Sequence, residues 1–315
     1  MIFSLMKKEA KKRIVKKKLL ITGANGFVAG SVIAQAQHNW ELYGIGRNEP
    51  PSDTASIKYH KLDLLEMEGL QKLFYHIKPD TVIHTAAMAD IDYCQNNQDI
   101  AEKVNVGITK ILVELCEKTG AKLIFCSTDT VFDGKKGFYT EEDAPNPINF
   151  YAETKIIGEQ IVKTLGKNGV IARLALVMGL PVIGKGNSFL TGFIEKLQAG
   201  ESLNFFENEI RSPIDVITLG KALIELAGNE SYGIIHLAGN SSLNRYEMAK
   251  QIAKKLGYSP GQIIATNSNT ITGRAPRPED ASMDNIKASK NLKTPMLSLK
   301  EGLELTMNFG KTTNS

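Results

Sequence analysis

Strand-like and helix-like segments alternate through the first 176 residues, and this alternation is the strongest constraint on the fold. Apolar, β-rich runs occur at 18–22, 41–46, 57–62, 81–86, 122–127 and 170–175. Helical patterns cover 27–37, a segment ending at 78, 100–118 and a segment ending near 165. Strands that alternate with helices indicate βαβ units, and continuous apolar runs are typical of parallel strands buried on both faces. The sequence therefore predicts an α/β fold with a doubly wound parallel sheet.

The alternation ends after Leu176, where a second part of the chain begins. Helices are expected at 188–198, 216–227 and 245–256, strands at 203–207 and 233–239, and a proline-broken loop at 272–280. The run 233–239 is expected to return to the main sheet. We predict a basic extension at 1–17, a large domain at 18–176 joined by 212–240, and a smaller C-terminal α/β domain from 177–211 and 241–315.

Positive charge is concentrated at the N-terminus. Residues 1–18 contribute +7 to a formal net charge of +4, so the rest of the chain sums to −3. A body with this balance is not a basic nucleic-acid surface. Charge blocks are usually solvated, so a solvated, helical or irregular extension is expected; an arm that contacts nucleic acid or a membrane surface is the alternative.

Cysteine usage and hydropathy favour a reducing compartment. The 3 cysteines, Cys94, Cys116 and Cys126, contain no CxxC spacing, and the last two sit in apolar patterns that predict buried thiols. No apolar run reaches membrane-spanning length, and no secretory pattern follows the N-terminal lysines. We therefore expect a cytoplasmic protein with no membrane span.

A glycine-rich loop follows the first predicted strand and precedes the first helix. It contains Gly23, Asn25 and Gly26, and the helix opens with Phe27 and Val28. Glycines let the backbone approach a pyrophosphate, whose charge suits a helix N-terminus. In a βαβ context this pattern predicts a Rossmann-type site for a dinucleotide, with these five residues in contact with it. A merely structural strand-to-helix turn is the alternative.

The ends of the second and third strands bear on the choice of cofactor. An acid at the end of the second strand would hold the ribose 2′-hydroxyl of NAD, whereas an arginine accommodates the 2′-phosphate of NADP. The strand ends at Arg47, which favours NADP(H) over NAD(H). Asp63, followed by Leu64 at the cofactor site, could bond the adenine amino group or act as the N-cap of the next helix.

A tyrosine and a lysine four residues apart carry the chemistry. Tyr151 and Lys155 lie in a predicted helix, where positions i and i+4 share a face. The ammonium is expected to lower the pKa of the phenol and make it a proton donor, and it can also bond a nicotinamide ribose. Thr128 closes the fifth strand and could orient a carbonyl. Ligands of such sheets bind beyond the carboxyl ends of the strands, so Thr128, Tyr151 and Lys155 are predicted to reduce a carbonyl.

No metal site is predicted. The five histidines are scattered without ligand spacing, and His84 on an apolar strand is expected to be a hydrogen-bonded core residue. The acidic residues between Asp129 and Asp143 could attract a cation, although a solvated loop is favoured.

Two segments resemble the extended short-chain dehydrogenase/reductases, and within them the dTDP-4-dehydrorhamnose reductase family. STDTVFDG at 127–134 and PINFYAETKIIGE at 147–159 are similar to that family's motifs. The resemblance implies that Thr128, Tyr151 and Lys155 form the catalytic triad. It also implies that Ala86, Ala87 and Met88 line the cofactor and that Asn105 lies beneath the site.

The resemblance also implies a reaction, the NAD(P)H-dependent reduction of the 4-keto group of a nucleotide-diphospho-sugar, giving dTDP-L-rhamnose. The smaller domain would bind the substrate. Asp129, Arg211 and Arg277 are the substrate-binding candidates, and the two arginines are assigned to the diphosphate because guanidinium pairs bidentately with phosphate. Either arginine could instead form a surface or interdomain ion pair.

The sequence departs from the family at several positions, and alternatives stay open. Ala29 replaces the third loop glycine, His84 and Thr85 replace the asparagine usual before the alanines, and Ala152 replaces the glycine after the tyrosine. An NAD-dependent nucleotide-sugar epimerase or dehydratase and a non-catalytic NADP-binding regulatory subunit are the alternative functions. The expected partner is a nucleotide sugar, and no nucleic acid is expected to bind. The chain could also form a homodimer.

Overall fold

The computed structural model describes residues 16–51, 57–184 and 188–309, so nearly all of the basic extension lies outside it. Its centre is a seven-stranded sheet in the order β11-β6-β5-β4-β1-β2-β3, in which every neighbouring pair is parallel. From the boundary between β1 and β4, successive strands are added outward in opposite directions, as in a doubly wound sheet. The strands are β1 (Lys17–Thr22), β2 (Trp40–Gly46), β3 (Ile57–Lys61), β4 (Thr81–His84), β5 (Lys122–Thr128), β6 (Gly169–Leu174) and β11 (Gly233–Leu237).

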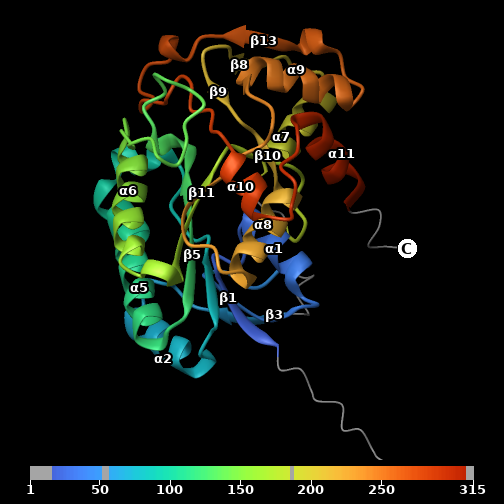
Figure 1. Ribbon diagram of the computed structural model, residues 1–315. Coiled ribbons are helices and arrows are strands. Elements are labelled where there is room, and N and C mark those ends of the chain that lie inside the picture. The colour runs from blue at the N-terminus through green and yellow to red at the C-terminus, as the bar shows by residue number, and fades with distance from the viewer. Residues whose placement is uncertain (1–15, 52–56, 185–187, 310–315) are drawn as a thin grey trace, which may run out of the picture.

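Helices cover both faces of this sheet (Figure 1). One apolar core lies between the sheet and α1 (Phe27–Ala36) and α8 (Val216–Gly228). The other lies between the sheet and α2 (Met67–Ile77), α5 (Ile108–Thr119) and α6 (Phe150–Lys163). The predicted α/β fold with a doubly wound parallel sheet is confirmed, and β11 returns to the sheet beside β6.

A second group of elements lies beyond one end of the sheet and has its own apolar core (Figure 1). It contains short strand pairs, β8 with β13, β9 with β12 and β7 with β10, that the sequence patterns largely missed. Its elements are β7 (Val177–Met178), α7 (Phe189–Gln198), β8 (Leu203–Phe206), β9 (Ile210–Arg211), β10 (Ile214–Asp215), β12 (Leu243–Asn244), α9 (Arg245–Lys255), β13 (Ile263–Thr266) and α11 (Leu299–Phe309). The remaining helix, α10 (Ile286–Asn291), packs on β11 and contributes to the core of the main sheet. The proposed domain boundaries stay a prediction.

The single helix expected at 100–118 is wrong in detail. The chain instead forms α4 (Gln98–Glu102), a π-helical turn η1 (Lys103–Gly107) and α5, after a short α3 (Ile91–Asn96) that was not expected. The π-helical turn contains Asn105, whose buried side chain bonds distant parts of the chain. Such turns often mark functional positions.

No helix in the ranges that the structure describes is long and apolar enough to cross a bilayer. The same ranges contain no cluster of three metal-ligating side chains. All three cysteines are buried and unpaired, as expected for Cys116 and Cys126.

The absence of a side chain at Gly158 lets α6 lie directly on β5. A Cβ there would come within 2.6 Å of the Phe125 ring, which is fully buried. We predict that Gly158→Ala destabilises the fold by about 1–3 kcal/mol through overpacking, despite alanine's higher helix propensity. The control is Gly192→Ala in α7, where no atom lies within 4 Å of the added Cβ, and this change should stabilise by up to ~1 kcal/mol. Urea denaturation measures both, and equal effects would contradict the account.

Candidate active site

The glycine loop has the backbone geometry of a phosphate-binding turn. Gly23 has φ +68°, and a Cβ there would lie 2.9 Å from the Ala86 backbone, so only glycine fits without strain. Helix α1 follows, with Gly26 as its N-cap, no side chain capping it and no acidic residue in its first turn. No capping side chain and no first-turn carboxylate therefore compete for the N–H groups at this end, including those of Phe27 and Val28. This arrangement suits a dinucleotide phosphate.

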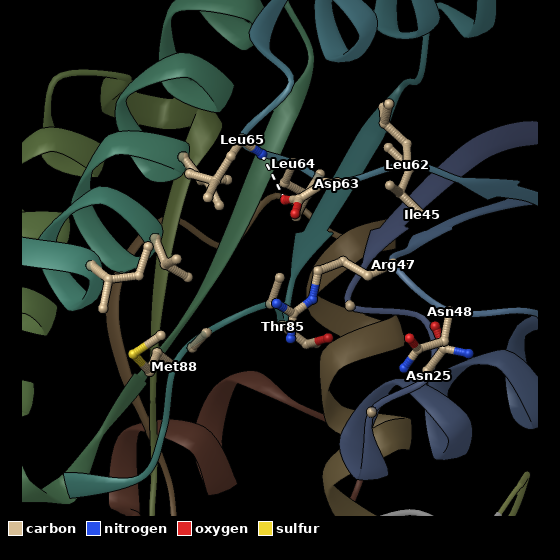
Figure 2. Close-up of a pocket in the computed structure, with 18 residues that line it drawn as sticks. Asn25, Ile45, Arg47, Asn48, Leu62, Asp63, Leu64, Leu65, Thr85 and Met88 are labelled. Carbon is tan, nitrogen blue, oxygen red and sulfur yellow. Dashed lines mark hydrogen bonds between the residues drawn. The ribbon is translucent and has the colours of Figure 1, made fainter. Parts of the chain in front are cut away.

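A cavity of about 400 Å³ opens beside this loop, at the carboxyl ends of β1, β2 and β4 (Figure 2). Most of the residues predicted to bind the cofactor line it, namely Gly23, Asn25, Gly26, Arg47, Asp63, Leu64, Ala86, Ala87 and Met88. Apolar side chains from α4, η1 and α5 close one wall: Ile100, Val104 and Ile108. The wall can take a flat aromatic base, while the glycine turn supplies donors for phosphate. The residues present thus fit a nicotinamide dinucleotide.

The end of β2 presents a cation to the cavity and turns its nearest acid away. Arg47 projects into the cavity from β2 (Figure 2). The carboxylate of Glu49 instead pairs with Lys61 at 2.6 Å and does not line the cavity. Asp63 accepts a hydrogen bond from Leu65 N at 3.0 Å, and α2 begins only at Met67, so Asp63 lines the cavity and is not the N-cap.

The three predicted catalytic residues come together from two elements. Thr128 is the last residue of β5, and Tyr151 and Lys155 occupy the same face of α6. Asn149 caps α6 through Ala152 N at 2.9 Å and donates to Pro276 O, so the start of α6 is anchored. The exposed fractions of Thr128, Tyr151 and Lys155 are 8%, 9% and 2%, which describes a nearly dry site.

The expected effect of Lys155 on the phenol is wrong for this structure. Burial raises the pKa of Tyr151, and the nearby Asp129 carboxylate acts in the same direction. Tyr151 therefore holds its proton firmly at neutral pH. A general acid must be protonated before it donates, so this direction still suits the predicted role.

The pKa of Lys155 lies closer to neutral pH than that of Tyr151. Burial lowers its pKa to about 8, while Cys126 and Glu159 act to raise it. Its ammonium stands 4.1 Å from the centre of the Phe125 ring. Among the described residues no hydrogen-bond acceptor is recorded for it, which leaves its three N–H donors for a ligand.

A buried hydrogen-bond chain joins the glycine loop to the catalytic helix. Thr22 Oγ1 lies 2.7 Å from His84 Nδ1, and His84 Nε2 lies 3.2 Å from Thr109 Oγ1, both at hydrogen-bond distance. Thr109 donates to the backbone oxygen of Asn105 at 2.7 Å. Burial lowers the pKa of His84 to about 3, so the ring is neutral. The prediction that His84 is a hydrogen-bonded core residue is confirmed.

Asn105 completes the connection beneath the site. Its side chain donates to Thr154 Oγ1 at 3.0 Å and bonds the backbone of Met88, accepting from N at 2.8 Å and donating to O at 3.1 Å. Thr154 in turn donates to the backbone oxygen of Tyr151 at 2.7 Å. The cofactor-lining loop and the catalytic helix are therefore held in one register.

The predicted substrate residues are already engaged with other side chains. Arg277 forms two hydrogen bonds with the Asp92 carboxylate, at 2.9 and 3.1 Å, and so links the 272–280 loop to α3. Arg211 lies 3.8 Å from Asp129 and is 5% exposed. This is the ion-pair alternative weighed for both arginines. Their contact with substrate stays a prediction, as does that of Asp129.

Sequence patterns missed the partners of Arg211. Glu209 lies 3.9 Å from Arg211 and also pairs with Arg274, while Arg245 lies over the Phe189 ring at 5.6 Å. Burial raises the pKa of Asp129 and lowers that of Arg245. Of these residues only Arg211 lies in a strand, whereas Arg245 opens α9 and Arg274 lies in a loop, so no single sequence pattern marks the cluster.

The acidic loop after β5 is held by its own contacts. Asp143 pairs with Lys136, which lowers the pKa of Asp143 to about 2, and Asp133 accepts from the Tyr139 hydroxyl at 2.6 Å. Each of these two carboxylates is therefore bound by its own protein donor.

The sequence of this chain is similar to a known protein family and to several characterised relatives. The sequence model of the RmlD substrate binding domain matches residues 17–310. Methionine adenosyltransferase 2 subunit beta of Rattus norvegicus is 30% identical over 283 residues, covering 88% of this chain and 83% of the relative. The protein named "Probable low-salt glycan biosynthesis reductase Agl14" of Haloferax volcanii is 28% identical, covering 88% and 93%.

A solved structure is similar over almost the whole length. The dTDP-4-dehydrorhamnose reductase of Bacillus anthracis, in complex with NADP, superposes with a TM-score of 0.82 at 26% identity, covering 93% of this chain and 99% of that one. By sequence and by structure, this chain belongs to the RmlD substrate binding domain family, within the extended short-chain dehydrogenases/reductases.

Proposed function

We propose that this protein reduces the 4-keto group of a nucleotide-diphospho-sugar with NADPH, with dTDP-4-dehydrorhamnose as the leading substrate and dTDP-L-rhamnose as the product. The observation that carries the proposal is the convergence of Thr128, Tyr151 and Lys155 at the carboxyl edge of the sheet, next to the dinucleotide cavity. The resemblance to dTDP-4-dehydrorhamnose reductases, one of them solved with NADP, supports the choice of reaction.

The bound nicotinamide would supply the hydride, and the chain's residues would manage the proton and the geometry. The glycine turn and the α1 N-terminus would hold the phosphates, and Lys155 would bond the ribose. Thr128 would orient the carbonyl through its hydroxyl, and the Tyr151 hydroxyl would protonate the developing alkoxide. Positioning of the two reactants and this proton transfer would supply most of the barrier lowering.

A regulatory role is the second candidate, because a curated relative at 30% identity is named as a subunit of methionine adenosyltransferase. An intact catalytic triad favours catalysis. Arg211 is buried beside Asp129 and the half-buried Arg277 is paired with Asp92, and this prior engagement of both guanidinium groups favours the regulatory role.

The first prediction concerns the proton donor. Tyr151→Phe should lower NADPH-dependent reduction of the keto sugar by roughly 10²–10⁴-fold, the range of general acid catalysis, and leave NADPH binding intact. Absorbance at the nicotinamide band follows turnover, and fluorescence titration follows binding. Equal rates in wild type and variant would reject the proton-donor role. Tight NADPH binding without turnover of any keto sugar by the wild type would favour the regulatory role.

The second prediction concerns the charge on Lys155. Its pKa in the folded chain, about 8, lies below the ordinary 10.5, so the unfolded chain binds more protons between these values and stability should rise with pH across that window. Lys155→Met should remove this rise and stabilise the fold at pH 7 by on the order of 3 kcal/mol, while abolishing turnover.

Denaturation from pH 7 to 10 measures the effect as the difference between variant and wild type. Burial also lowers the pKa of Lys122 to about 8, and that contribution remains in both proteins and cancels. A variant less stable than wild type at pH 7 would contradict the account.

The third prediction concerns cofactor preference. If Arg47 binds the 2′-phosphate, Arg47→Ala should weaken NADPH binding about 10- to 100-fold, the value of one or two charge-assisted hydrogen bonds, and leave NADH binding unchanged. Lys61→Ala is the matched control, because Lys61 is a nearby exposed cation that does not line the cavity. Parallel loss of NADPH and NADH affinity in Arg47→Ala would refute the assignment.

A further inference from the structure

A buried ion pair lies one helical turn beyond Lys155 and takes no part in the chemistry described above. Glu159 on α6 and Arg173 on β6 are both 0% exposed. Arg173 Nε donates to Glu159 Oε1 at 2.9 Å and its terminal nitrogen donates to Oε2 at 2.8 Å, a bidentate pair. Ser127 Oγ donates to the same Oε1 at 2.6 Å.

A row of polar residues crosses three adjacent strands beside Glu159. Ser127 on β5 is in register with Arg173 on β6, and Arg173 is in register with His236 on β11. Arg173 also lies 3.4 Å from His236 Nε2 and stands over the Phe132 ring at 5.1 Å. One carboxylate on α6 thus binds the residue next to Thr128 and the neighbouring strand.

A buried ion pair is a costly contact in free energy, so holding α6 against the sheet does not by itself explain it. Moving two charges out of water costs several kcal/mol per ion, and apolar side chains of similar volume often hold a core equally well. What the bidentate geometry adds is a defined register between α6 and the strand ends. Tyr151, Lys155 and Glu159 follow at intervals of four on one helix face, so this register passes directly to the two catalytic side chains.

We propose that Glu159 and Arg173 are positioning residues for the reduction, fixing α6 on β5 and β6 so that Tyr151 stays beside Thr128 and Lys155 keeps a carboxylate within reach of its ammonium. The inference rests on the proposed function for its kinetic consequence. Its electrostatic consequence holds without any substrate.

The electrostatic argument depends on what surrounds Lys155. From α6 it faces Glu159, from β5 the Cys126 thiol and the Phe125 ring, and from β4 the neutral His84. At neutral pH Glu159 is the one carboxylate among these described neighbours, and it acts to raise the pKa of Lys155 against the effect of burial. Without it, the ammonium should lose its proton at lower pH.

Two variants separate geometry from charge. Arg173→Lys keeps both charges and loses the bidentate fork. Glu159→Gln/Arg173→Met removes both charges together, so that no lone ion is left buried. Thr81→Val is the control for a lost buried hydrogen bond far from the site, since Thr81 donates to Ala227 O at the opposite end of β4.

The substrate-free readout is NMR titration of the Lys155 Cε resonance in ¹³C-lysine-labelled protein, identified by its loss in Lys155→Met. The double variant should titrate about one pH unit below wild type, whereas Arg173→Lys and Thr81→Val should titrate as wild type does. The kinetic readout is kcat and its pH profile with NADPH and the keto sugar. Arg173→Lys should lose at least about tenfold in kcat with little change in KM for NADPH, and the alkaline limb of the double variant should move with its titration.

The inference is overturned if the double variant folds and titrates like Thr81→Val, or if Arg173→Lys folds with wild-type kcat. If the double variant does not fold, Arg173→Lys, which keeps the charge balance, decides through kcat. If wild type reduces no keto sugar, the proposed function fails, and the NMR titration still decides whether Glu159 sets the charge of Lys155.

Discussion

Helix α6 can present Tyr151 and Lys155 to Thr128 only while it stays pressed against β5 and β6, and buried contacts hold it there. Gly158 removes the side chain that would separate α6 from Phe125, and Glu159 bonds Ser127 and Arg173. One turn before Gly158, Thr154 accepts a hydrogen bond from the Asn105 amide. Each contact uses a group too polar or too small to be explained by core packing alone. The site is therefore a consequence of how one helix is seated.

The parallel sheet supplies the complementary half of the arrangement. Because β1, β4 and β5 run in one direction, the glycine turn, the Ala86–Met88 loop and Thr128 emerge at the same edge. The chain of neutral hydrogen bonds through His84 then fixes the first of these relative to α5. Charge enters at Lys155, where burial holds the pKa near 8. A small change in its surroundings can therefore alter its protonation at physiological pH.

Periodicity and local motifs were enough to predict the sheet, the return of 233–239 to it and the grouping of the glycine loop, Arg47 and Asp63 around one cavity, because these follow from neighbouring residues. The break of the 100–118 helix was missed because Asn105 bonds residues 17 and 49 positions away. The Tyr151 pKa was wrong for a related reason, since its burial depends on the assembled site. Likewise, the pairing of Arg277 with Asp92 joins residues 185 apart. Long-range polar contacts leave no periodic trace in a sequence.

The most direct test of whether this protein is an NADPH-dependent keto-sugar reductase follows the hydride itself. The protein is incubated with NADPH deuterated at the transferred position and a dTDP-4-keto-6-deoxy sugar, and the product is analysed by mass spectrometry and NMR. A reductase with exchangeable cofactor places one deuterium on carbon 4 of the sugar, with one NADPH oxidised for each product formed. A sugar product without deuterium would indicate an epimerase with internally recycled NAD. Bound NADPH with no product from any keto sugar would contradict catalysis and point to the regulatory role.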